Sequence, residues 1–155
     1  MPRARSATAT APSLRVRDFL ALVHEGVRGR LGPKLDGMAW RQRFSFVQYY
    51  RGSPDVHYEV WAQRKTGRIE IGLHFEGERD RNYQAAELLA LRAPDIQASI
   101  GSGYELEEWT KTWTRLHCTF EAQSLTAELA DDAAERVVAL IHGMEPIIDQ
   151  MELRR

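Results

Sequence analysis

The segment VHYEVWAQ, residues 56–63, alternates between apolar and mostly polar side chains, and RIEIGLHFE, residues 68–76, repeats the alternation. A period of two is typical of β-strands that bury one face. Short turn sequences, GSPD at 52–55 and KTGR at 65–68, separate these segments from each other and from the aromatic segment 43–50. Strands joined by turns this short pair antiparallel. We therefore expect three consecutive antiparallel strands that pack on one face.

Two helices are predicted from apolar residues with helical spacing on either side of these strands. The first would be capped by Ser13 and end at Gly32-Pro33. The second would begin with Asp80 or Asn82 as its cap, and Pro94 would kink it or start a new helical turn. The inner stripe predicted for the second helix consists of Tyr83, Ala86, Leu89 and Ala90.

The remaining sequence predicts a hairpin and a long last helix. The hairpin covers 104–108 and 112–120, and Thr126 would cap the helix that follows. The element order α-βββ-α-ββ-α predicts an α+β fold. We expect a two-layer sandwich in which three main helices cover one face of a five-stranded antiparallel sheet. Residues 13–155 would form one domain, preceded by a disordered tail at 1–12.

The composition indicates a soluble, cytoplasmic protein. Apolar residues make up 43% and charged residues 28% of the chain, which is ordinary for a globular domain. The longest apolar runs have five residues, whereas a membrane span needs about 20, and no signal-peptide segment follows the N-terminus. Cys118 is the only cysteine, so an intramolecular disulfide and a cysteine-based zinc site are excluded. We expect Cys118 to be a buried, unreactive core thiol.

Basic residues are concentrated at the N-terminus, although the net charge of the chain is only −1. The first 34 residues contain seven basic and two acidic side chains, and the rest of the chain contains 14 basic and 20 acidic ones. Nucleic-acid binders usually present a basic face. An accessory nucleic-acid module that uses this basic arm is therefore one alternative, which the acidic body of the chain does not favour.

The sequence contains no recognisable catalytic motif, and we assign no catalytic residue, no cofactor and no metal ligand from it. No short histidine spacing of the His-x-x-x-His type occurs. Three histidines nevertheless occupy polar positions of the alternating pattern in predicted strands. They could form an acid/base or metal patch if those strands were adjacent. The residues of this alternative are His57, His74, His117, Glu59, Glu70 and Arg115.

One short pattern resembles the metal site of restriction-type nucleases, which place an Asp before a Glu-x-Lys on neighbouring strands. Here Asp55 precedes Glu70-Ile71-Gly72, so glycine stands where the lysine would stabilise charge on the phosphate. A nuclease function is therefore not predicted.

Our main functional hypothesis rests on large apolar residues at strand positions where the alternating pattern otherwise has polar side chains. Trp61, Trp109 and Trp113 fall there, together with Val47 and Tyr49. Because a solvated sheet face rarely exposes so much apolar area, we expect a contact surface and a homodimer. The candidate binding residues are Trp61, Trp113, Tyr49, His57, Glu59, Glu70, His74, Arg115 and His117, with the tryptophans at the centre and the charged residues as a rim.

Residues 69–148 resemble a family of uncharacterised bacterial α+β domains that occur alone or attached to restriction-type proteins. The resemblance implies a context in DNA-related defence and transfers no catalytic residue. Glu108 precedes Trp109 here, whereas the family pattern has Trp before Glu. The resemblance rests on Ile69-Glu70-Ile71, a helix start at Asn82, Ile96 followed by Ile100-Gly101, Leu106-Glu107-Glu108-Trp109 and Glu145-Pro146-Ile147-Ile148.

Overall fold

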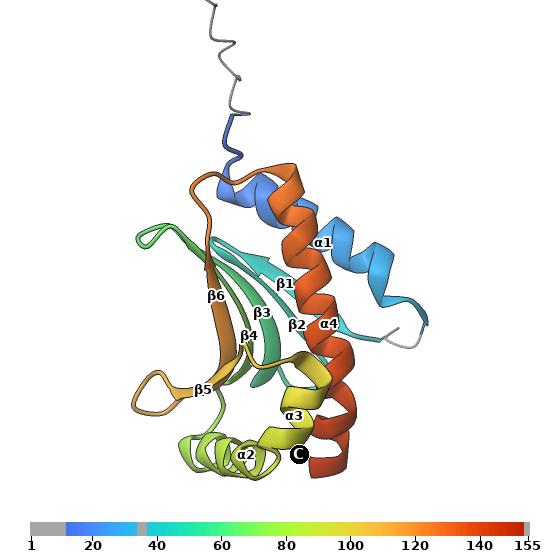
Figure 1. Cartoon of the computed structure of the whole chain (residues 1–155), viewed down its shortest axis with the longest axis vertical. Helices are drawn as coiled ribbons and strands as arrows, with labels where there is room; N and C mark the ends of the chain where they lie inside the picture. The colour runs from blue at the N-terminus through green and yellow to red at the C-terminus, as the bar shows by residue number, and fades with distance from the viewer. Residues whose placement is uncertain (1–11, 34–36, 154–155) are drawn as a thin grey trace, which may run out of the picture.

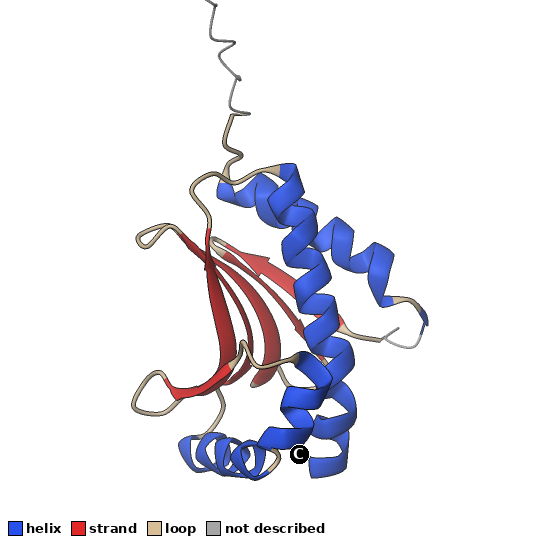
Figure 2. Ribbon diagram, in the orientation of Figure 1, coloured by secondary structure: helices blue, strands red, loops and turns tan. Residues whose placement is uncertain are grey.

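The computed structural model describes residues 12–33 and 37–153, so almost all of the predicted N-terminal tail lies outside the described residues. A single antiparallel sheet forms one layer, and helices form the other (Figures 1 and 2). This arrangement confirms the predicted α+β class, with six strands instead of five and four helices instead of three within the described ranges. The strands are β1 (Ala39–Arg43), β2 (Phe46–Tyr50), β3 (Val56–Gln63), β4 (Arg68–Phe75), β5 (Glu105–Glu108) and β6 (Thr114–Glu121).

The strand order is β1-β2-β3-β4-β6-β5, and every neighbouring pair is antiparallel. The sixth strand arises because the segment predicted as one strand over 43–50 is part of a hairpin. Arg43 pairs with Phe46 across a two-residue turn at Phe44-Ser45, and the Phe44 side chain is 95% exposed. The aromatic run had no strict alternation, so its apolar character alone could not reveal this turn.

Val47 and Tyr49 were assigned to the wrong face of the sheet. Their partners in β3 are Val60 and Tyr58, which lie on the helix-covered face, and both residues are buried. The register of an antiparallel pair puts opposite residues on the same face. Tyr49 is therefore a core residue, whose hydroxyl lies 3.0 Å from Nδ1 of His24, and it is not part of an outer contact surface.

Two long helices cover the sheet, α1 (Val16–Leu31) and α4 (Ala127–Met151), and they pack against each other (Figure 1). The apolar stripe predicted for the first helix is confirmed, since its residues are buried. Thr126 caps α4 as predicted, because its hydroxyl accepts a hydrogen bond from the Leu129 amide. Ser13 does not cap α1, which starts at Val16; its hydroxyl accepts instead from the Leu125 amide.

The predicted break at Pro94 is confirmed, since α2 (Arg79–Leu91) ends before it and α3 (Ala93–Ile100) contains it near its start. Both helices lie at one end of the sheet (Figure 1). The helix α2 begins earlier than predicted, so neither Asp80 nor Asn82 is its cap. Its buried residues are Asn82, Ala85 and Leu89, so only Leu89 of the predicted inner stripe is correct.

The hydrophobic core lies between the sheet and the helices α1 and α4. In the central strands, every second side chain points into this core, for example Ile69, Ile71 and Leu73 of β4. Among the described residues, no helix is both long and apolar enough to cross a membrane. The helices leave the other face of the sheet uncovered, and we call it the outer face.

Candidate functional site: a buried His–Glu cluster on the outer face

The outer face carries a cluster of buried polar side chains. Glu70 and His74 have no exposed surface, and His57 is only 1% exposed. This reverses the arrangement expected from the sequence, in which tryptophans occupied the centre and charged residues the rim. We call the following residues the outer-face cluster: Gln48, His57, Glu59, Glu70, His74, Glu76, Glu107, Arg115 and His117.

Strand register brings the cluster together. His57 of β3 lies opposite His74 of β4, which in turn lies opposite Arg115 of β6. Gly72, which precedes His74 by two positions in β4, lies between Glu59 of β3 and His117 of β6. Strands far apart in sequence thus supply side chains to one small area, because β6 pairs directly with β4.

Gly72 makes room for the buried acids and histidines. A Cβ atom at this position would lie 2.9 Å from Oε1 of Glu70, 3.0 Å from Cβ of His117 and 3.1 Å from Nε2 of His74. A contact under 3.0 Å essentially never occurs with a real Cβ atom, so a larger residue would require Glu70 to move and would press on His117 and His74. The glycine that replaces the lysine of the nuclease pattern therefore has a steric role here.

Each of the three histidines has one ring nitrogen held by a hydrogen bond outside the centre of the cluster. Nδ1 of His57 donates to the carbonyl oxygen of Pro54 at 2.7 Å. Nδ1 of His74 lies 2.8 Å from Oε2 of Glu76, and Nε2 of His117 lies 2.7 Å from Oε2 of Glu107. Metal-binding histidines are commonly oriented in this way, by a carbonyl or carboxylate on the nitrogen that does not bind the ion.

The other ring nitrogens face the carboxyl groups of Glu59 and Glu70, and Nε2 of His57 also lies 3.4 Å from Oε2 of Glu76. Nε2 of His74 lies 2.6 Å from Oε1 of Glu70 and 3.6 Å from Oε2 of Glu59. Nε2 of His57 lies 3.6 Å from Oε1 of Glu59, and Nδ1 of His117 lies 3.9 Å from Oε1 of Glu70. Ligand atoms of Glu59, Glu70 and His74 all lie within 4.8 Å of one another, as do those of His57, His74 and Glu76.

Further polar contacts hold these carboxylates in position. Nε2 of Gln48 donates to Oε1 of Glu59 at 2.7 Å and lies 3.1 Å from Nε2 of His57. Arg115 donates to Oε2 of Glu70 at 2.9 Å and to Oε1 of Glu107 at 3.3 Å. Two buried nitrogens, Nε of Arg115 and Nδ1 of His117, have no hydrogen-bond partner in the described structure.

Hydrogen bonds and charges within the cluster shift the pKa values of His57, Glu59, His74 and Glu76. Burial disfavours the charged form of His74, but its hydrogen bonds to Glu70 and Glu76 outweigh burial and raise its pKa to about 10. Burial likewise opposes charge on Glu76, yet its bonds to His57 and His74 lower its pKa to about 2. For the same reasons the pKa of Glu59 is lowered and that of His57 is raised. The cluster is thus a set of charged groups that compensate one another.

Three tryptophans cover the cluster on its solvent side. The ring of Trp109 meets His74 edge-on, with centroids 5.5 Å apart, and lies over the Arg115 guanidinium at 4.7 Å. Trp61 and Trp113 flank it, with ring centroids 6.3 Å and 5.6 Å from that of Trp109. All three are half-buried. They exclude water from the charged groups, which strengthens the electrostatic interactions beneath them.

Trp109 and Trp113 belong to the β5–β6 loop, residues 109–113, and α2 holds this loop in position. Nδ2 of Asn82 donates to the carbonyl oxygen of Thr112 at 2.7 Å and to that of Gly77 at 2.9 Å. The Tyr83 hydroxyl donates to the carbonyl oxygen of Lys111 at 3.3 Å. A buried asparagine at the start of α2 therefore fixes the covering loop against the sheet.

The structure brings together every candidate binding residue named from the sequence except Tyr49. Sequence reasoning missed Gln48, Glu76 and Glu107. Gln48 was missed because the parity of its strand was assigned wrongly. Glu76 shares the alternation of Glu70 and His74, and Glu107 lies in the predicted strand 104–108, but the sequence did not show that either carboxylate contacts a histidine. The available signal was that Glu76 lies two residues after His74 and that Glu107 lies in the predicted hairpin that also contains His117.

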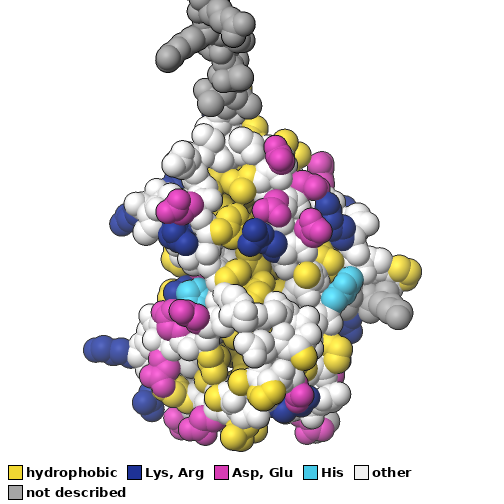
Figure 3. Space-filling model, in the orientation of Figure 1, with side chains coloured by type: hydrophobic (Ala, Val, Ile, Leu, Met, Phe, Trp, Pro, Cys, Tyr) yellow, Lys and Arg dark blue, Asp and Glu magenta, His cyan; other side chains and the backbone are white. Residues whose placement is uncertain are grey.

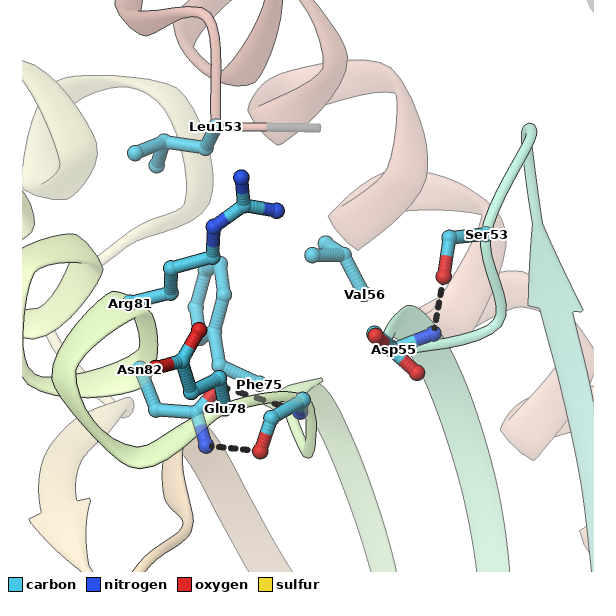
Figure 4. Close-up of a pocket in the computed structure, with 9 residues that line it drawn as sticks. Ser53, Asp55, Val56, Phe75, Glu78, Arg81, Asn82 and Leu153 are labelled. Carbon is cyan, nitrogen blue, oxygen red and sulfur yellow. Dashed lines mark hydrogen bonds between the residues drawn. The ribbon is translucent and has the colours of Figure 1, made fainter. Parts of the chain in front are cut away.

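A separate hollow lies at the end of β3 and β4 beside α2, with a volume of about 230 Å³ (Figure 4). Asp55, Glu78 and Arg81 surround this hollow. Val56 and Phe75, whose strand positions face the helix-covered side of the sheet, form its apolar wall. Asp55 thus lines a different part of the molecule from Glu70, which gives the nuclease-like pattern no common site. Cys118 is half-buried, not fully buried as predicted, and burial raises the pKa of its thiol.

The basic N-terminal arm is described only in part, since Arg3, Arg5 and Lys34 lie outside the described residues. Within α1, Arg30 pairs with Asp131 at 2.7 Å and Arg17 with Asp18 at 3.7 Å. Acidic and basic side chains are interspersed on the face shown in Figure 3. The nucleic-acid alternative stays a prediction that these observations do not strengthen.

Comparisons with known proteins add little to this description. No family model matches the chain, and no curated protein matches it. Among solved structures, the chain is similar to YbjN from E. coli, a candidate transcription regulator, at 11% identity and a TM-score of 0.33. That match covers 81% of this chain and 93% of YbjN.

Proposed function

We propose that the chain is a metal-binding protein whose outer-face cluster holds one divalent transition-metal ion, such as Zn²⁺. The ligands in this proposal are His57, Glu59, Glu70 and His74. The observation that carries it is that ligand atoms of Glu59, Glu70 and His74 lie within 4.8 Å of one another, with Nε2 of His57 3.6 Å from Oε1 of Glu59 and each histidine oriented by a second hydrogen bond.

The spacing of the ligand atoms supports the proposal. Atoms bound to Zn²⁺ at about 2.0–2.2 Å lie about 3.3–3.5 Å apart when the coordination is tetrahedral. Nε2 of His57 and Oε1 of Glu59 are 3.6 Å apart, as are Nε2 of His74 and Oε2 of Glu59. The 2.6 Å contact between His74 and Glu70 is shorter, because a proton lies between them. A metal ion would take the place of that proton, with a small outward shift of the two groups.

Charge balance also supports a divalent ion. The buried cluster contains the side chains of Glu59, Glu70 and Glu76, and hydrogen bonds to these acidic groups raise the pKa values of His57 and His74. One divalent cation carries the same charge as the two histidine protons that it would displace. Binding would therefore leave the net charge of the buried cluster unchanged, which avoids the cost of an uncompensated charge.

The ligand types indicate which metals would bind. Mixed imidazole and carboxylate ligands suit Zn²⁺ and divalent iron, nickel or copper, whereas Ca²⁺ and Mg²⁺ prefer oxygen alone. No thiolate contributes, since the only cysteine, Cys118, lies on the opposite parity of β6 from His117. Because the ligands are buried beneath tryptophans, the site would be closed rather than open to substrate, as structural metal sites are.

Isothermal titration of the metal-free protein with Zn²⁺ tests the proposal. We expect one ion per chain for the wild type and at least about 100-fold weaker binding for Glu59→Gln and His74→Gln, since even residues that only orient a ligand cost about 10–100-fold. His142→Gln is the matched control, because His142 is an exposed histidine on α4. Circular dichroism of each variant establishes that it is folded.

The outcome that contradicts the proposal is equally specific. Wild-type protein that takes up no Zn²⁺ would overturn it. So would binding that His142→Gln removes and His74→Gln leaves intact, because the ion would then sit on an exposed histidine.

A second candidate function is self-association through the three tryptophans. The observation that favours it is that Trp61, Trp109 and Trp113 form one contiguous, half-buried group on the outer face. Tryptophan is enriched at binding hot spots. Replacing Trp61 and Trp113 together with serine should shift the protein toward monomer in sedimentation velocity while its circular dichroism stays intact. A folded variant with unchanged association would exclude this contact.

A further inference from the structure

We propose that the chain associates head to tail with further copies of itself, by pairing β1 of one copy with β5 of the next. The two strands are the opposite edges of the same sheet. This contact rests on observations other than those behind the metal proposal, although Glu107 of β5 also belongs to the outer-face cluster, and it does not use Trp61, Trp109 or Trp113.

Both edges offer unused backbone groups. The strand β1 pairs only with β2, and β5 only with β6. Within the described ranges, no backbone hydrogen bond leads from residues 39–43 or 105–108 to any segment outside the sheet. A free edge of this kind is a template for another strand, unless its side chains prevent pairing.

The side chains of the two edges are opposite in charge. The strand β1 reads AWRQR, with two arginines and no acid, and β5 reads ELEE, with three glutamates and no base. Pairing of like edges would bring like charges together, which disfavours a symmetric edge-to-edge dimer. Pairing β1 with β5 brings arginines opposite glutamates, so charge selects a second copy of this chain in a head-to-tail arrangement.

The faces of the two strands match as well as their charges. Arg41 lies opposite Gln48, so the arginines of β1 are on the outer face, and Glu105 and Glu107 share that face because they lie opposite His117 and Arg115. An antiparallel register with Arg43 opposite Glu105 and Arg41 opposite Glu107 therefore continues the outer face across the contact.

On the other face the same register brings apolar groups together. Trp40 is 49% exposed and Leu106 is 37% exposed, and they would be diagonal neighbours across the new strand pair. Leu106 also lines an apolar groove of about 350 Å³ beside α2 and α3, together with Leu89, Ile96, Tyr104 and Leu116. Trp40 is stacked on His24 of its own chain, with ring centroids 3.7 Å apart, and its exposed side would face this groove of the neighbouring copy.

A charge exchange between Arg43 and Glu105 tests the contact. Neither side chain takes part in an ion pair or side-chain hydrogen bond with another described residue, and both are exposed, so substitution leaves the fold intact. In sedimentation velocity at about 20 mM salt, the average mass of the wild type should rise with protein concentration above 17.8 kDa, and at about 1 M salt it should return toward the monomer.

Arg43→Glu and Glu105→Arg should each weaken this association by about tenfold, since an attractive cross-strand pair becomes repulsive. The double variant restores an opposite-charge pair and should regain association. Arg64→Glu, in the exposed β3–β4 turn, is the control and should behave as wild type. A wild type that is monomeric at every concentration, single variants that associate normally, or a double variant that fails to recover would each overturn the proposal.

Discussion

Gly72 lies in β4 between strands that each contribute an ionisable side chain, and its missing side chain leaves the space that the cluster occupies. Its neighbours Glu70 and His74 are fully buried, which is costly unless every charge is paired. Pairing is achieved by residues on four strands. A single added methyl group therefore acts on the whole cluster.

Gly72→Ala should destabilise the protein by about 1–3 kcal/mol and weaken Zn²⁺ binding, since its Cβ would force Glu70 and His74 apart. Denaturant unfolding measures the first effect and calorimetric titration the second. Gly29→Ala is the control, because a Cβ there meets no atom within 4 Å. It should stabilise α1 by about 0.5–1 kcal/mol. If Gly72→Ala is as stable as Gly29→Ala, the cluster is looser than described.

The stability of the metal-free protein should depend on pH through His74 and Glu76. The pKa of His74 is raised to about 10, so its stabilising contribution is complete below about pH 6.5 and is lost as the pH rises through 10. The pKa of Glu76 is lowered to about 2, so its contribution is complete above about pH 4.5 and is lost as the pH falls through 2. Maximal stability of the cluster therefore lies between about pH 4.5 and 6.5.

Denaturant unfolding of wild type and His74→Gln at pH values from 5 to 10 checks this prediction. The free energy of unfolding of the wild type should fall on the alkaline side, and His74→Gln should remove most of that fall. An alkaline loss of equal size in both proteins would mean that other groups cause it.

At the scale of elements, the sequence was most informative where alternation was strict. The period of two in β3 and β4 predicted that His57, Glu59, Glu70 and His74 share one face, and the register confirms it. The pairing of β6 with β4 could not be predicted, because strand order depends on tertiary packing rather than on local pattern. The turn at Phe44 could not be recognised either, since it carries an exposed phenylalanine where glycine or asparagine is usual.

The position of the covering loop also could not be predicted from the sequence pattern. The alternation of the predicted strands 104–108 and 112–120 was extended to place Trp109 and Trp113 on the outer face, whereas both lie in the loop between β5 and β6. The position of a loop residue is fixed by contacts with other elements, here by Asn82 and Tyr83 of α2. Binding residues held in a loop by a neighbouring helix leave no periodic signal.

Asn82→Ala should release the covering loop. The substitution removes the hydrogen bonds of a buried amide to Thr112 and Gly77, and we expect a loss of about 1–3 kcal/mol. Tryptophan fluorescence should shift to the red as Trp109 becomes exposed to water. Thr126→Ala, which removes the cap of α4 and about 1 kcal/mol, is the control and should leave the fluorescence unchanged. Equal emission spectra for both variants would contradict a role of Asn82 in holding the loop.

At the scale of the molecule, the two faces of one sheet have different roles. One face packs against α1 and α4 and supplies the hydrophobic core, and the other holds charged groups under a tryptophan cover. The core fixes the strand register, and the register in turn fixes the distances between histidines and carboxylates. Binding a metal ion would add stability to the folded state alone, by about 2.7 kcal/mol at an ion concentration 100-fold above Kd.

The most direct test of the metal proposal is the visible absorption spectrum of the protein with Co²⁺ in place of Zn²⁺. We predict d–d bands that saturate at one Co²⁺ per chain, that differ from those of the aqueous ion, and that disappear when Zn²⁺ is added. They should be absent in His74→Gln and unchanged in His142→Gln. A spectrum identical to that of aqueous Co²⁺, or bands that persist in His74→Gln, would contradict a metal site in the outer-face cluster.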